Sequence, residues 1–256
     1  MDKRCSCEPH CDLFCLMATE MGVSVLHPGG YSSTKTIGKH LSLHDKSTIL
    51  DLACGVGTTS RFLYKKYRSN ITGVDINGSF IEAARKGNHA SKKVRYIVAD
   101  ALLLPFPDNS FDSVIAQAFL VLIDDQKQAL KEIHRVLKSG GYFGSLELSW
   151  AMLPTDVIYN DLLRKTCTSF IPRTKEYNEW IELFKSEGFN CDNVIKNAMT
   201  SGFFQMIRAE GIVNSLSIVK NMMMNKRNKE RMMEVQKTFH KYRDYLGYGI
   251  YLLRKI

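Results

Sequence analysis

The chain has 256 residues, of which 45% are hydrophobic and 24% charged, and its formal net charge is +9. This length suffices for the buried core of one large α/β domain without help from metals or disulfides. No apolar run approaches the roughly 18 residues of a membrane span. Residues 1–17 lack the pattern of a signal or transit peptide, so we expect a soluble, cytoplasmic protein.

Seven cysteines, an odd number with no secretory signal, favour free thiols over a disulfide framework. Four of them crowd the N-terminus: Cys5, Cys7, Cys11 and Cys15. Their C-x-C-x3-C-x3-C spacing contains none of the C-x2-C pairs that are typical of zinc sites. We therefore predict no bound metal and leave the role of this cluster open.

The basic excess lies at the C-terminal end, because residues 202–256 alone carry about +7. Such an excess can attract nucleic acid or an anionic membrane surface. A solvated helix face explains it equally well. The sequence contains no separate RNA-binding module, so a nucleic-acid partner is not expected.

Short apolar runs rich in β-branched residues occur at 48–54 and 71–76, and a helix-like pattern follows each of them. This is the rhythm of βαβ units, whose strands run parallel. The same signals predict a helix over 125–137 and further strands at 95–98, 111–117, 142–148, 190–198 and 248–254. The predicted fold class is α/β, a Rossmann-like doubly wound, mostly parallel seven-stranded sheet with helical lid insertions.

Residues 208–246 show apolar side chains at helical spacing, which predicts one or two helices inserted before the last strand. We expect one face of this insertion to close over a substrate pocket, with Leu216, Val219, Met223 and Phe239 on that face. Four cations are expected to remain in solvent: Lys226, Arg227, Lys229 and Arg231.

No linker or repeat divides the chain, so residues 1–256 are predicted to form a single domain. Within it we expect an N-terminal cap over 1–45 and a cofactor-binding core over 46–150. The remainder of the sheet follows over 151–256, with the helical lid at about 202–246.

A buried strand runs into a glycine-rich turn and a helix between Ile49 and Ser60. Gly55 and Gly57 allow a ligand to approach the backbone closely. Nicotinamide- and flavin-binding loops carry a third glycine where this chain has Ser60, which makes a pyrophosphate ligand a poorer fit.

Acidic residues follow the next two strands. Asp75 ends the second strand eighteen residues after Gly57, where its carboxylate can accept hydrogen bonds from ribose hydroxyls. Asp100 closes the third strand, where its carboxylate and the amide of Ala101 can read the edge of an adenine ring. Three strand ends are thus predicted to converge on one nucleoside ligand.

With these motifs in place, the run over 47–148 resembles the class I S-adenosylmethionine methyltransferases, especially the small-molecule group that includes quinone-biosynthesis enzymes. The most specific matches are DALLLPFPDNSFD at 100–112 and EIHRVLKSGG at 132–141. They resemble that group's DAxxLPFPDxSFD and ExxRVLKPGG blocks. The resemblance implies an enzyme that uses S-adenosyl-L-methionine.

The resemblance also implies roles for individual residues. Gly55 and Gly57 would face the methionine part of the cofactor and Asp75 its ribose, while Ile76 would lie on the adenine face and Asp100 with Ala101 at the adenine edge. Gln117 would lie near the amino-acid moiety. Residues 27–34, HPGGYSST, resemble the segment that covers the cofactor in phosphobase and arsenite methyltransferases, which would place Gly30 and Tyr31 over the sulfonium. The predicted cofactor-binding set is Gly30, Tyr31, Asp51, Ala53, Gly55, Gly57, Asp75, Ile76, Asp100, Ala101 and Gln117.

The chain departs from the pattern of this family at two positions. Leu122 stands where many relatives carry a histidine near the acceptor, and Ser139 replaces the usual proline before the Gly140-Gly141 pair. No catalytic residue can be assigned; Glu147 and His27 are the candidates for a base if one is needed. The predicted function is methyl transfer to a small, partly apolar acceptor by in-line displacement under the lid. RNA or protein methylation, and a non-catalytic cofactor-binding subunit, remain as alternatives. The acceptor, the atom methylated and the oligomeric state are not readable from the sequence.

Overall fold

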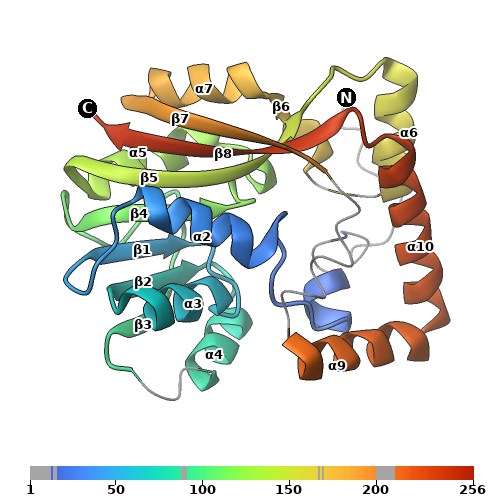
Figure 1. The fold of residues 1–256 in the computed structure, drawn as a ribbon, viewed down its shortest axis with the longest axis horizontal. Coiled ribbons are helices and arrows are strands. Elements are labelled where there is room, and N and C mark those ends of the chain that lie inside the picture. Colours follow the sequence, from blue (N-terminus) through green and yellow to red (C-terminus); the bar gives the residue numbers. More distant parts are fainter. Residues whose placement is uncertain (1–12, 14–15, 88–90, 167, 169, 200–210) are drawn as a thin grey trace.

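The computed structural model describes residues 13, 16–87, 91–166, 168, 170–199 and 211–256. Their strands form one sheet in the order β3-β2-β1-β4-β5-β8-β7, with the short β6 pairing with β5 off this path (Figure 1). Strands β1 to β5 pair in parallel, while β8 is antiparallel to both β5 and β7. This order confirms the predicted α/β fold class. The strands are β1 (Thr48–Leu52), β2 (Asn70–Asp75), β3 (Val94–Val98), β4 (Phe111–Gln117), β5 (Leu137–Trp150), β6 (Lys175–Glu176), β7 (Phe189–Ala198) and β8 (Leu246–Lys255).

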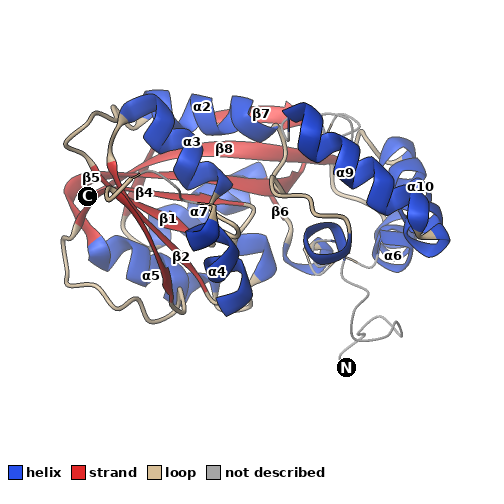
Figure 2. Cartoon of the chain, turned by 90° about the horizontal axis from the view of Figure 1, so that it is seen from below, coloured by secondary structure: helices blue, strands red, loops and turns tan. Residues whose placement is uncertain are grey.

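Helices cover both faces of the sheet, because successive residues of its central strands point to opposite sides and both sides are apolar. Leu50 and Val114 belong to the core on one face, whereas Ile49 and Ile115 belong to the core on the other. Figure 2 shows the strands in red between the helices. The covering helices are α2 (Gly30–His40), α3 (Thr58–Tyr67) and α4 (Gly78–Lys86) on one face, and α5 (Gln126–Val136) and α7 (Tyr177–Ser186) on the other.

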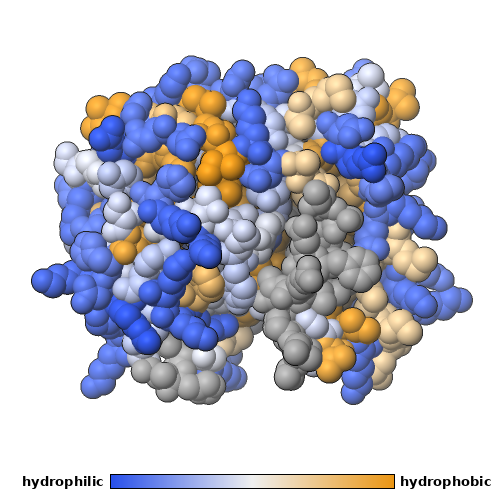
Figure 3. Space-filling view, viewed as in Figure 1, coloured by the Kyte–Doolittle hydropathy of each residue, from blue (hydrophilic) through white to orange (hydrophobic). Residues whose placement is uncertain are grey.

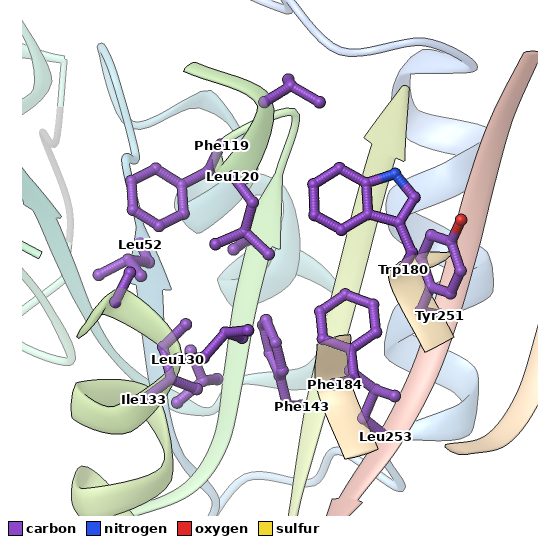
Figure 4. Close-up of a cluster of buried hydrophobic side chains, with 14 of the residues drawn as sticks. Leu52, Phe119, Leu120, Leu130, Ile133, Phe143, Trp180, Phe184, Tyr251 and Leu253 are labelled. Carbon is purple, nitrogen blue, oxygen red and sulfur yellow. The ribbon is translucent and has the colours of Figure 1, made fainter. Parts of the chain in front are cut away.

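The larger core holds α5 and α7 against the sheet (Figure 4). Phe143 of β5 meets Phe184 of α7 edge to face, with ring centroids 6.0 Å apart, and Phe184 in turn packs against Tyr251 of β8. Leu130 and Ile133 reach the same core from α5 and are fully buried. This packing makes the sheet a fixed platform for the residues at its carboxyl edge.

The predicted strand boundaries differ most at β5, which begins at Leu137 instead of Tyr142. Leu137 already pairs with Phe111, and the register then shifts between Phe111 and Ser113. The Gly140-Gly141 pair lies inside this irregular stretch, with Gly140 at φ 69°, and does not precede the strand. A glycine pair usually signals a turn, so the local pattern was misleading here.

Four helical segments gather at one end of the sheet, on the right in Figure 1. They are the π-helix η1 (Leu16–Glu20), α6 (Asp156–Thr166), α9 (Gly211–Met224) and α10 (Lys226–Lys241). The side chain of Asn228 donates to Glu20 Oε2 at 2.8 Å, and that of Asn221 donates to the carbonyl of Met21 at 3.3 Å. Tyr242 Oη donates to Asp161 Oδ2 at 2.7 Å. We call these four segments the lid.

The orientation predicted for the lid insertion is wrong for α9. Leu216, Val219 and Met223 are exposed, and the side chain that faces the lid interior is Ile218, which is fully buried beside Met21. The apolar residues of α9 lie all around the helix, so spacing alone could not choose the inner face.

Two further expectations for the lid have different outcomes. Phe239 of α10 does pack inward, stacked on Phe170 with centroids 6.4 Å apart. Arg231 does not remain in solvent, because its guanidinium donates to the backbone carbonyl of Thr166 at 2.8 Å. This bond fastens α10 to the end of α6.

Candidate cofactor site

The glycine-rich turn after β1 has the left-handed backbone that its sequence requires. Ala53, Gly55 and Gly57 have φ angles of 54°, 53° and 78°. A Cβ on Gly57 would lie 2.5 Å from the Tyr96 hydroxyl, so this glycine lets the loop pack on β3. A Cβ on Gly55 would meet nothing within 4 Å. The loop is therefore held from below at Gly57 and open to a ligand at Gly55.

Asp75 lies at the carboxyl end of β2, beside this loop. Its Oδ2 accepts a hydrogen bond from the Gly55 amide at 2.9 Å, and its Oδ1 accepts one from the Asn77 amide at 2.9 Å. Each carboxylate oxygen keeps a second lone pair for another donor. The carboxylate is thus positioned by its own backbone to receive a pair of hydroxyl groups.

The side chain of Asp51 points into the core below the glycine-rich turn and not toward the exposed face at Gly55. Its side chain is buried, and Oδ2 accepts a 2.5 Å hydrogen bond from the hydroxyl of Ser60. Ser60, at the position of the missing third glycine, therefore has a structural partner. Burial raises the pKa of Asp51 to about 7, although the hydrogen bond from Ser60 works in the opposite direction.

This raised pKa leads to a prediction about stability. Between about pH 4, the ordinary value for an aspartate, and pH 7 the folded chain keeps a proton on Asp51 that the unfolded chain has lost, so the contribution of this group to stability is lost as the pH rises. The stability of Asp51→Asn relative to the unmodified protein should therefore be greater at pH 8 than at pH 5, by about 3 kcal/mol. Urea unfolding at both pH values measures this; an equal offset at both would contradict it.

The residues at the carboxyl ends of β2 and β3 form the part of the site next to Asp75. Asp75 pairs with Val98 in the register of these strands, and Ile76 and Val98 are both exposed large apolar side chains. Asp100 is exposed, and its Oδ1 accepts from the Leu102 amide at 2.9 Å, which orders the turn that contains the half-buried Ala101. The exposed aliphatic side chains of Ile76 and Val98, next to the Asp100 carboxylate, could contact the face and the polar edge of a planar ring such as adenine. Val98 was missed in the sequence because it reads as an ordinary strand residue.

A polar network joins β4 to the N-terminal segment and to the glycine loop. Gln117 Oε1 accepts from Thr34 Oγ1 of α2 and from Thr59 Oγ1 of α3, both at 3.2 Å, and its Nε2 lies 3.4 Å from His27 Nδ1. Three segments far apart in sequence thus meet at one amide. Thr34 and Thr59 were not predicted, since a threonine in a helix carries no signal of its own.

The first turn of α2 packs against α3. Gly29 and Gly30 have φ angles of 74° and 51°, which turn the chain into the helix. Tyr31 stacks on Phe62 of α3, with ring centroids 4.7 Å apart and planes inclined by 17°. The predicted residues Gly30 and Tyr31 are therefore brought to the helix that the glycine loop opens.

Neither candidate base is presented freely to an acceptor. Glu147 is fully buried inside β5 and accepts hydrogen bonds from the amides of Leu120 and Val121 at 3.1 and 3.2 Å and from the hydroxyl of Ser145 at 3.1 Å. Burial raises its pKa to about 8. These bonds hold the turn η2 (Leu120–Leu122) against the sheet, which is a structural role.

His27 is buried, and its Nε2 has no partner among the described residues. Burial lowers the pKa of His27 to about 4, so its imidazole is neutral near pH 7. An unmade hydrogen bond on a buried nitrogen costs roughly 1–3 kcal/mol. A polar group of a bound ligand could remove that cost.

Comparison with known proteins agrees with this geometry. A family model described as "Methyltransferase domain" matches residues 50–144, the glycine loop through the first half of β5. An uncharacterised protein of Haemophilus influenzae is 29% identical over 229 residues, covering 86% of this chain and 89% of that protein. The demethylmenaquinone methyltransferase of Staphylococcus aureus MRSA252 is 31% identical over 154 residues, covering 58% of this chain and 64% of that enzyme. These matches identify residues 50–144 as a class I, S-adenosylmethionine-dependent methyltransferase domain.

Solved structures agree with the fold of this methyltransferase. The MccD protein superposes with a TM-score of 0.74 at 27% identity, covering 90% of this chain and 99% of that one. A Haemonchus contortus phosphoethanolamine N-methyltransferase in complex with S-adenosyl-L-methionine superposes with a TM-score of 0.73 at 19% identity, covering 93% of this chain and 58% of that one. S-adenosylmethionine is the cofactor of this family, and the open loop at Gly55 beside the Asp75 carboxylate fits it.

The described part of this methyltransferase contains neither a membrane-spanning helix nor a metal-binding cluster. No helix there is long and apolar enough to cross a membrane. No group of three or more histidine, cysteine or acidic side chains there is arranged to hold a metal ion. The cysteines at 5, 7, 11 and 15, for which we predicted free thiols, lie outside the described residues.

Proposed function

We propose that this methyltransferase transfers the methyl group of S-adenosylmethionine to a small, apolar acceptor by in-line displacement beneath the lid. The observation that carries the proposal is the apolar character of the residues at and just after the carboxyl ends of β4 and β5. Phe119, Leu122 and Trp150 stand there, and Phe170 and Phe239 belong to the same apolar cluster. Leu122 occupies the place where many relatives carry a histidine, so the acceptor side is apolar at this position as well.

The proposed cofactor roles follow the site geometry. Gly55 and Gly57 admit the methionine portion, Asp75 accepts hydrogen bonds from the ribose hydroxyls, and Ile76 lies against the adenine, whose edge meets Asp100 and the Ala101 amide. Asp51 and Ala53 support the loop, Gly30 and Tyr31 cover the sulfonium, and Gln117 faces the amino-acid moiety. The neutral His27, held next to Gln117, supplies a polar atom to the same moiety.

The chemistry asks little more of the chain. A sulfonium is an activated methyl donor, so catalysis by the protein consists of aligning the acceptor and excluding water. The lid can do both, because η1 and α6 are each joined to α10 by a hydrogen bond, and η1, α9 and α10 share an apolar cluster. We propose that residues 1–256 act as a single catalytic domain.

The relatives support an apolar acceptor. The Staphylococcus aureus enzyme is named for methylating demethylmenaquinone, and a Gibberella zeae relative, 34% identical over 148 residues but covering only 37% of that enzyme, is named a sterol 24-C-methyltransferase. The chain therefore spans less than two thirds of these two enzymes. A quinone or isoprenoid lipid is the acceptor class we propose to test first.

The test is methyl transfer from radiolabelled S-adenosylmethionine to a lipid extract, to total RNA and to protein from the same cells. Label in the lipid fraction supports the proposal. Label in RNA or protein alone would replace it with the corresponding alternative. Tight binding of the cofactor with no label in any fraction would favour a non-catalytic cofactor-binding subunit.

Charge changes on the lid separate the lipid and RNA alternatives independently. Lys226 and Lys229 are exposed at the start of α10, and the double variant Lys226→Glu/Lys229→Glu should leave turnover of a detergent-dispersed acceptor within about twofold, since surface charges contribute little to the fold. An RNA substrate would instead bind much more weakly and with a flatter salt dependence. Initial rates at two salt concentrations distinguish these results.

A further inference from the structure

The outward face of α9 carries a row of apolar side chains. Leu216, Val219 and Met223 are 67%, 39% and 59% exposed, and Met224 beside them is 76% exposed. Their spacing places them on one face of the helix, opposite the buried Ile218. Contiguous apolar surface of this kind is rare on monomeric soluble proteins and marks a site of interaction.

Lysines lie within and beside this row. Lys220 lies one turn after Leu216, within the row, and Lys226 and Lys229 follow at the start of α10. Figure 3 shows hydrophobic residues in orange and tan over α9 at the lower right, next to blue hydrophilic residues along α10. The first turn of α10 contains no acidic residue, although a helix N-terminus favours anions and disfavours lysine. Lys226 lies 3.9 Å from Glu230 one turn further on, but an exposed pair of this kind stabilises a helix only slightly, so helix stability is a weak explanation of these lysines.

We propose that α9 and the first turn of α10 dock on an anionic membrane surface. A helix that lies in the plane of a membrane inserts its apolar side chains at the acyl boundary and keeps its cations level with the lipid phosphates. Lys220 suits this arrangement, because a lysine can bury its aliphatic stem and extend its ammonium to the phosphates. The 14 residues of α9 allow such an arrangement without a span.

Charge favours this occupant over a second copy of the chain. In a symmetric dimer through α9, the same patch would face itself and bring its lysines together. A membrane rich in acidic lipids offers an apolar layer for the aliphatic side chains and a negative layer for the lysines. If the acceptor is the lipid of the proposed function, docking would set the lid against the phase that contains it.

The experiment is co-sedimentation of the full chain with vesicles of phosphatidylcholine, with or without phosphatidylglycerol. We expect binding to the anionic vesicles that weakens with salt and is at least tenfold weaker in Leu216→Ser/Met223→Ser. Neutralising Lys220 or Lys226 with glutamine should weaken it about fivefold each. Two remote substitutions are matched controls and should bind normally: Ile256→Ser, at an 81% exposed apolar residue by the C-terminus, and Lys65→Gln on α3.

Three results would overturn the proposal: no binding to either vesicle, equal binding to both, or binding unaffected by the α9 substitutions. A dimer that the Leu216→Ser/Met223→Ser variant loses in sedimentation velocity, without vesicle binding, would assign the patch to a second copy. Circular dichroism and S-adenosylhomocysteine binding of the variants show that they are folded. Because vesicle binding is measured without methyl transfer, its failure is distinguishable from failure of the proposed function.

Discussion

Replacing Asp75 with alanine is expected to weaken S-adenosylhomocysteine binding by about 1–3 kcal/mol, a factor of roughly 5 to 150. The variant loses charge-assisted hydrogen bonds to ribose, and the Gly55 amide loses its acceptor, so the loop becomes less ordered. Isothermal titration calorimetry measures the change. A matched control is Asp244→Ala, which removes an exposed carboxylate of the α10–β8 connection and should not alter binding.

The ribose assignment can be tested separately from the loop. Adenosine and 2′-deoxyadenosine should bind the unmodified protein with different affinities, and this difference should vanish in Asp75→Ala. If the variant bound S-adenosylhomocysteine as tightly as the unmodified protein, the cofactor would have to lie elsewhere on the carboxyl edge.

Trp180→Ala is expected to destabilise the fold by about 3–5 kcal/mol, which lowers the melting temperature by roughly 10 °C. Trp180 of α7 is fully buried, stacks near Phe184 with centroids 6.0 Å apart, and donates from Nε1 to the carbonyl of Leu148 at 3.0 Å (Figure 4). Alanine leaves a large cavity and removes the donor to the Leu148 carbonyl near the carboxyl end of β5. Urea unfolding and differential scanning calorimetry measure the loss.

Trp180→Phe is the control that separates the two causes, because it keeps an aromatic ring but removes the donor. It should cost less than half as much as alanine. A loss below about 1 kcal/mol in Trp180→Ala would mean that α7 is not part of the cooperative core.

The order of elements was readable from the sequence, since it depends on local patterns. β1 and β2 are short apolar runs, the left-handed turn between β1 and α3 needs glycine at Gly55 and Gly57, and Asp75 must fall at a strand end when a βαβ unit has this length. These features involve neighbours in the chain. The predicted sheet and the family resemblance therefore proved correct, while the residue-level cofactor roles stay predictions.

The sequence by itself thus determined the α/β class, the succession of strands along the chain and the place of the glycine loop. Only the tertiary structure decided which side of α9 is buried and that the Glu147 carboxylate accepts hydrogen bonds from the amides of η2. It also decided that Thr34 and Thr59 both donate to Gln117. Each of these outcomes depends on a partner from a distant part of the chain. A contact of that kind is fixed by packing and burial of the whole fold, and no local periodicity encodes it.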